Sequence, residues 1–127
     1  MHQDIIDHIN ANFTYQYDRD QYGKPDRWKI MEGPQYVGDC EDYSLTVLWH
    51  IAGKSWFKFW LLQLCGVASL RLCTIHGSHH IVLRYKGQYI DNIQQQWVKK
   101  QDMLDLGYKF KFTTPVIYTA VSMWVKR

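Results

Sequence analysis

Apolar residues recur at helical spacing in two segments near the start of the chain. In residues 4–13 the isoleucines and the phenylalanine fall three to four positions apart, which predicts a first amphipathic helix. Residues 40–51 have one broad apolar face, with Asp39 placed as an N-cap and Gly53 as a stop, and predict a second helix. Between them, residues 14–39 are rich in turn formers and predict a long loop of functional importance.

The following segments predict strands. Residues 57–64 combine aromatic and aliphatic side chains over the length of a strand, and residues 70–75 fit a second one. Residues 80–85 and 88–90 flank Lys86-Gly87, a suitable two-residue connection for a β-hairpin. An antiparallel sheet is therefore expected after the two helices.

The C-terminal part predicts a short helix over residues 99–106 and closing strands over residues 110–113 and 116–125, with a turn at Pro115. The length of 127 residues suits one domain with one modest core, so residues 1–127 are expected to form a single unit. Helices followed by antiparallel strands place this unit in the α+β class.

Composition and charge narrow the classes of partner and the compartment that we expect for this protein. The formal net charge of +3 is mild, and lysines and arginines are dispersed, so the sequence does not support a nucleic-acid partner. Three cysteines without regular spacing are typical of reduced thiols. Residues 1–8 lack the basic start and apolar run of a signal peptide, and we expect a cytoplasmic protein.

No segment predicts membrane insertion. The most apolar stretch, residues 56–67, is interrupted by Lys58 and Gln63 and is too short to cross a bilayer. The aromatic cluster of residues 56–60 would suit a membrane surface or a partner, but a buried strand explains it more simply. We therefore expect no membrane contact. The oligomeric state is left open.

The strongest chemical signal is residues 38–43, with the sequence Gly-Asp-Cys-Glu-Asp-Tyr, followed downstream by His80 and Asp91. A free thiol is mostly protonated at neutral pH, so a nucleophilic cysteine needs a nearby imidazole, and a carboxylate can orient that imidazole. The predicted hairpin brings His80 and Asp91 close together near its open end. Cys40, in the first turn of a helix, would gain from the helix dipole, although its acidic neighbours act in the opposite direction.

These segments resemble the bacterial transglutaminase-like cysteine peptidases, whose best-known members are the LapG-type proteases. The resemblance covers most of the chain, from residues 9–13 through residues 38–45 to residues 80–83 and 90–92. It implies Cys40 as nucleophile, His80 as general base and Asp91 as orienting carboxylate. The implied fold is a papain-like, transglutaminase-like core in which the nucleophile helix packs on an antiparallel β-sheet.

The resemblance favours a hydrolase that cleaves amide bonds of a protein or peptide substrate through a thioester. Deamidation of protein glutamine and transglutamination use the same triad and remain alternatives. A non-catalytic interaction module of a phage or host protein is a further alternative. LapG-type enzymes are exported, whereas this chain is short and shows no export signal, which suits a bacterial cytosol or a bacteriophage-encoded protein.

Other residues have competing interpretations. Trp28 and Tyr36 either line a substrate-binding cleft or cover a small core. Cys65 and Cys73 are expected to be small buried hydrophobes. Alternation along the strand should turn His79 away from the face of His80.

The sequence contains two candidate metal sites. Cys73 clusters with His76, His79 and His80, but without a known zinc-finger spacing, so zinc is not expected. The resemblance implies calcium ligands at Asp39 and Glu41. Calcium needs six to eight oxygens, so an additional carboxylate such as Asp26 would have to contribute, and the alternative is that both residues are capping or solvated carboxylates. We expect no other cofactor.

Overall fold

The computed structural model describes residues 2–15, 30–31, 35–38, 40–113, 119–121 and 123. Helices and strands follow one another in the order α1 (Gln3–Asn12), β1 (Phe13–Tyr15), β2 (Tyr36–Gly38), α3 (Cys40–Ile51), α4 (Trp56–Leu64), β3 (Ala68–Ile75), β4 (Ser78–Tyr85), β5 (Gln88–Ile90), α5 (Lys100–Asp105) and β6 (Tyr108–Thr113). The chain is thus mixed α+β, as the sequence predicts.

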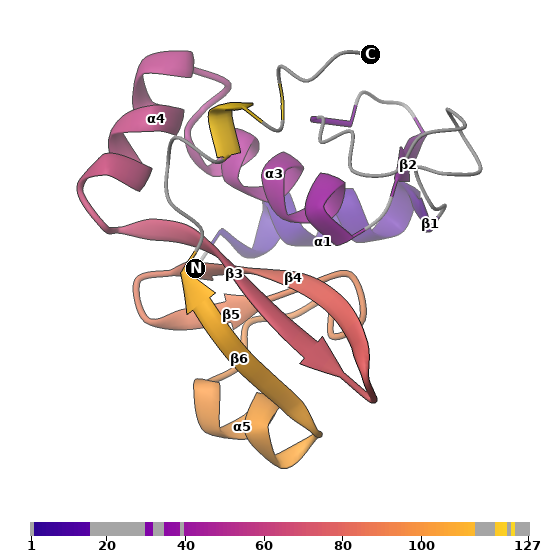
Figure 1. The fold of residues 1–127 in the computed structure, drawn as a ribbon. Coiled ribbons are helices and arrows are strands. Elements are labelled where there is room, and N and C mark those ends of the chain that lie inside the picture. The colour runs from indigo at the N-terminus through magenta and orange to yellow at the C-terminus, as the bar shows by residue number, and fades with distance from the viewer. Residues whose placement is uncertain are drawn as a thin grey trace.

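The architecture is a four-stranded antiparallel sheet with helices packed on it. The strand order is β5-β4-β3-β6, and β1 and β2 form a separate parallel pair. Figure 1 shows α1, α3 and α4 gathered on one side of the sheet, while α5 lies at the opposite end beside β6. α3 packs against β4, and α1 packs against α3.

Successive side chains of β3 and β4 point to opposite faces of the sheet, and each face contributes to a buried cluster. Leu70 of β3 and its partner Leu83 of β4 join the larger core, which lies against the helices. Cys73 and Val82 join a smaller cluster with Met103 of α5. The helices therefore hold the sheet from two sides, and the position of β4 relative to α3 is fixed by the larger core.

The hairpin of β4 and β5 forms at the predicted turn. Lys86 and Gly87 have φ angles of 50° and 81°. Positive φ at both central residues is the conformation whose twist matches two antiparallel strands. The register pairs Leu83 with Ile90 and Tyr85 with Gln88. This register places Asp91 directly after β5, next to the strand that carries His80.

The strand predicted over residues 57–64 is wrong, because this segment is helix α4. Ser55 is the N-cap, and its side chain accepts a hydrogen bond from the Lys58 backbone amide at 3.3 Å. Gly66, with a φ of 77°, ends the segment in the left-handed region, where glycine is favoured. β-Propensity predicted a strand here, and the local capping residues outweigh that propensity.

The closing strand predicted over residues 116–125 is also wrong in its described part, since residues 119–121 and 123 are helical. The predicted loop of residues 14–39 carries short strands at its two ends, β1 and β2. These strands pair in parallel, Phe13 with Tyr36. Among the helices that the structure describes, none has the length and apolar character needed to span a bilayer.

Candidate active site

Cys40 is the first residue of α3 and follows closely after β2. Gly38 makes this close connection possible. A Cβ atom at residue 38 would lie 2.7 Å from both the Cβ and the Oδ2 of Asp42, and 3.0 Å from the sulfur of Met31. Any larger residue would therefore force β2 and the first turn of α3 apart, which explains the glycine at the start of the 38–43 sequence.

The start of α3 is buried, although it is polar. Every residue from Glu41 to Leu48 is buried, and Asp42 is fully inaccessible to solvent. The Cys40 thiol donates a hydrogen bond to Glu41 Oε2 with a sulfur-to-oxygen distance of 2.9 Å. A buried polar group costs free energy unless it has a partner, and this contact satisfies the thiol and one oxygen of Glu41.

Asn10 of α1 connects the two halves of the site. Its Oδ1 accepts a hydrogen bond from the hydroxyl of Tyr43 in α3. Its Nδ2 donates to the backbone carbonyl of Gln95, at 2.8 Å, in the loop that follows Asp91. Burial raises the pKa of Tyr43 far above its ordinary value, and the charge of Asp91 adds to the effect. One side chain thus links α3 to the loop after the hairpin.

His80 and Asp91 form the predicted pair. His80 Nε2 and Asp91 Oδ2 are 2.8 Å apart, and both side chains are buried. Asp91 is held from its other side as well, because Oδ1 accepts from the Gln94 backbone amide at 2.7 Å and its carbonyl oxygen accepts from the Gln95 amide. The carboxylate therefore presents one defined oxygen to the imidazole.

Tyr108 is a member of this network that the sequence did not reveal. Its hydroxyl donates to Asp91 Oδ2 at 2.6 Å, the oxygen that also contacts His80. Gln94 Nε2 donates to the Tyr108 hydroxyl at 3.5 Å. Burial and the hydrogen bond to Asp91 raise the pKa of Tyr108 well above its ordinary value. Tyr108 begins β6, and only the pairing of β6 with β3 brings it to Asp91.

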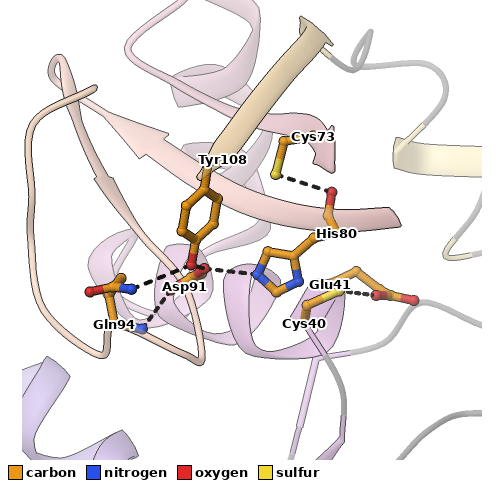
Figure 2. Close-up of polar contacts among 7 residues, drawn as sticks. All are labelled: Cys40, Glu41, Cys73, His80, Asp91, Gln94 and Tyr108. Carbon is orange, nitrogen blue, oxygen red and sulfur yellow. Dashed lines mark hydrogen bonds and ion pairs between the residues drawn. The ribbon is translucent and has the colours of Figure 1, made fainter. Parts of the chain in front are cut away.

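Figure 2 shows how these residues are arranged. Asp91, Gln94 and Tyr108 lie on one side of the His80 ring, and Cys40 and Glu41 lie on the other. Because Nε2 is engaged by Asp91, the ring directs Nδ1 toward the side of the thiol. The tautomer with hydrogen on Nε2 donates to the carboxylate and leaves Nδ1 able to take a proton.

The other cysteines and the neighbouring histidine differ in their exposure to solvent. His79 is exposed, as strand alternation predicts. Cys73 is fully buried, donates to the His80 carbonyl at 3.5 Å, and has a pKa raised to about 12, chiefly by burial. Cys65 was expected to be buried and is exposed, because residues 57–64 form a helix and Cys65 caps its C-terminal end at the surface. The expectation for Cys65 is therefore wrong.

The predicted substrate-binding and metal residues are only partly described. Trp28 and Asp39 lie outside the described residues. Tyr36 is buried in β2, where its hydroxyl lies 3.2 Å from His8 Nε2 and its ring packs edge-on against His50. Its role in substrate binding stays a prediction. Glu41 is buried beside Cys40, and within the described part of the chain no three His, Cys, Asp or Glu residues form a group suited to a metal ion.

Comparison with known proteins adds no assignment. No protein-family model matches the chain, and a search of the curated proteins finds no match either. The chemistry of the site must therefore be argued from the arrangement of Cys40, His80, Asp91 and Tyr108.

Proposed function

We propose that this protein is a cysteine hydrolase that cleaves amide bonds of a protein or peptide through the triad Cys40, His80 and Asp91. The observation that carries the proposal is the buried 2.8 Å contact between His80 Nε2 and Asp91 Oδ2, on a hairpin packed against the helix that Cys40 begins. A carboxylate on one ring nitrogen and a thiol facing the other are the arrangement that cysteine nucleophiles require.

In the first half of the reaction, the Cys40 thiol turns from Glu41 Oε2 to His80 Nδ1, which takes its proton, and the thiolate attacks the carbonyl carbon. The negative charge that develops on the carbonyl oxygen is placed near the start of α3, where backbone amides lack acceptors within the helix. The C–N bond then breaks as His80 returns the proton to the departing amine. The products of this half are a thioester on Cys40 and a free amine.

In the second half, His80 takes a proton from water, the resulting hydroxide attacks the thioester, and the carboxylic acid leaves as the Cys40 sulfur regains its proton. If the first carbonyl belongs to a glutamine side chain, the amine released is ammonia. Attack of water on that thioester then gives deamidation, and attack of a second amine in place of water gives transglutamination. The triad is shared by all three reactions, and the resemblance favours peptide hydrolysis.

We also propose that the α+β core is papain-like and transglutaminase-like. Two features support this: a cysteine at the first position of a helix, and a packed antiparallel hairpin that supplies the histidine and the aspartate in that chain order. This proposal predicts that the substrate chain reaches the N-terminal end of α3.

The test is the pH dependence of alkylation by iodoacetamide, with each cysteine followed separately by peptide mapping. The chain contains its own references, since Cys65 is an exposed thiol and Cys73 is buried with a pKa of about 12. A free thiol is almost entirely protonated at pH 6, so we expect Cys40 to react roughly 100-fold faster than Cys65 at that pH.

The variant His80→Ala should remove this advantage, and His79→Ala is the matched control, because His79 is the exposed neighbour on the same strand. Asp91→Asn should leave an intermediate rate. Equal rates at Cys40 and Cys65, unchanged by His80→Ala, would overturn the triad and favour a non-catalytic interaction module. Incubation with casein then separates peptide hydrolysis, which creates new N-termini, from the two reactions at glutamine, which release ammonia.

A further inference from the structure

Helix α4 exposes an apolar face to solvent. Phe57, Leu61 and Leu64, which fall on one side of a helix, have exposed fractions of 75%, 41% and 70%, and the neighbouring Trp56 is 52% exposed. The opposite side of α4 is packed, with Phe59 fully buried in the larger core. Exposed apolar residues are normal singly, but a contiguous aromatic and aliphatic face indicates an interaction site.

The segment of the chain that contains α4 carries charges of one sign only. Between Asp42 and Asp91 the sequence contains no aspartate or glutamate, and its lysines and arginines are Lys54, Lys58, Arg71, Arg84 and Lys86. Four of these five lie at or near the two ends of α4, two at each end.

Lys54 and Lys58 are exposed at the N-terminal end of α4. At the other end, Arg84 Nη2 donates to the Gly66 carbonyl at 3.1 Å, and the Lys86 amide donates to the Val67 carbonyl at 2.9 Å. The β4–β5 turn is thereby fixed against the segment that leaves α4. The exposed apolar face thus has cations at both ends.

We propose that this α4 face binds the surface of a membrane that contains anionic lipids. Phe and Trp side chains with interspersed lysines are typical of helices that lie in the headgroup region, with the apolar side chains inserted and the cations at the phosphates. The cations placed at the two ends of the face give the charge complementarity. The helix spans only Trp56–Leu64, so it lies on the membrane and does not cross it.

This proposal does not rest on the proposed catalytic function. It uses none of the residues of the triad, and Figure 1 shows α4 at the side of the molecule opposite α5. It revises the expectation of no membrane contact, because that expectation assumed that residues 56–60 belong to a buried strand. The helix instead turns Phe57 outward, while the half-exposed Trp56 ring packs against Trp49 with 4.3 Å between the ring centroids.

The experiment is flotation of the full chain with vesicles of phosphatidylcholine alone or with about one third phosphatidylserine, at low and physiological salt. We expect binding only to the anionic vesicles, weaker at high salt. The double variant Phe57→Ser/Leu64→Ser should bind about tenfold more weakly or worse. Lys54→Gln/Lys58→Gln should weaken binding by roughly fivefold per lysine.

The matched control is Leu104→Ser/Leu106→Ser, which removes two leucines with exposed fractions of 41% and 51% from the region of α5. It should bind as the wild type does. Absence of binding to anionic vesicles at low salt, or equal binding by the α4 double variant, would overturn the proposal. A concentration-dependent dimer that Phe57→Ser/Leu64→Ser abolishes, without vesicle binding, would assign the face to a second copy of the chain and overturn it equally.

Discussion

The helices α3 and α4 follow one another in the chain, and each is unusual in a different way. α3 buries polar side chains, and α4 exposes apolar ones. α3 buries Glu41, Asp42, Ser44 and Thr46 together with its apolar residues. α4 leaves Phe57, Leu61 and Leu64 in contact with solvent. A helix of a small domain normally buries apolar side chains and exposes polar ones. Each exception has a free-energy cost.

The two exceptions have different physical meanings. Among the buried polar groups of α3, Thr46 has a specific partner, because its Oγ1 accepts from the Met31 amide at 2.7 Å, whereas Ser44 Oγ has no hydrogen-bond partner among the described residues. The packing of α3 against β4 places Cys40 beside the strand that carries His80. The exposed apolar groups of α4 lie on a surface with cations at both ends and fix nothing within the molecule. A buried polar cluster thus indicates an organised site, and an exposed apolar face indicates a contact with something else.

The largest effect is expected from Cys40→Ala. With Cys40 as the proposed nucleophile, hydrolysis of a casein substrate should fall by about 10⁴-fold or more. The thermal unfolding midpoint should stay near that of the wild type, because Cys40 is only partly buried. Cys65→Ala is the control, since it removes a surface thiol and should leave activity intact. Equal hydrolysis by Cys40→Ala and wild type would contradict the assignment of the nucleophile.

The contrast between the two sides of α4 predicts the next largest effect. Phe59→Ala should lower the free energy of unfolding by about 3–5 kcal/mol, because Phe59 is fully buried and its loss leaves a cavity. Phe57→Ala, two residues earlier and mostly exposed, should change it by less than about 0.5 kcal/mol. Urea denaturation followed by circular dichroism measures both. Similar losses in the two variants would show that the outer face of α4 is also packed.

Tyr108→Phe tests the buried network beyond the triad. It removes the hydroxyl that donates to Asp91, a hydrogen bond to a charged group, and should cost about 1.5–3 kcal/mol of stability. If Tyr108 positions the aspartate, alkylation of Cys40 at pH 6 should also slow severalfold. The control is Tyr89→Phe, which removes a buried hydroxyl that accepts from Arg71 at 3.3 Å. An unchanged alkylation rate in Tyr108→Phe would limit that residue to a structural role.

The smallest effect concerns the buried thiol behind His80. The pKa of Cys73 is raised from 9.0 to about 12, chiefly by burial, so between these values the folded protein keeps a proton that the unfolded chain has lost. Stability should therefore fall as pH rises above about 9. Urea midpoints measured from pH 8 to 10.5 should decrease less steeply in Cys73→Ala than in the wild type. An identical slope in both proteins would show that Cys73 does not contribute.

The sequence predicted those helices and turns that depend on residues close together in the chain. Three predictions depend on signals within a few residues, and the structure confirms all three. They are the helix at residues 40–51, the turn at Lys86-Gly87 with its positive φ angles, and the proximity of His80 to Asp91 that follows from the hairpin register. The segment 57–64 was predicted wrongly because aromatic and aliphatic residues without clear alternation fit both a strand and a helix. The Ser55 cap was the available signal for the helix.

The sequence by itself determined the order of Cys40, His80 and Asp91 and the hairpin that joins the last two, since these follow from residue identity and short-range backbone preferences. Only the tertiary structure decided that Tyr108 and Asn10 hold the site, and that Phe57 and Leu64 face solvent. Those facts depend on β6 pairing with β3 and on which side of α4 meets the core. Such contacts between distant segments are selected by packing of the whole domain, which short-range patterns do not encode.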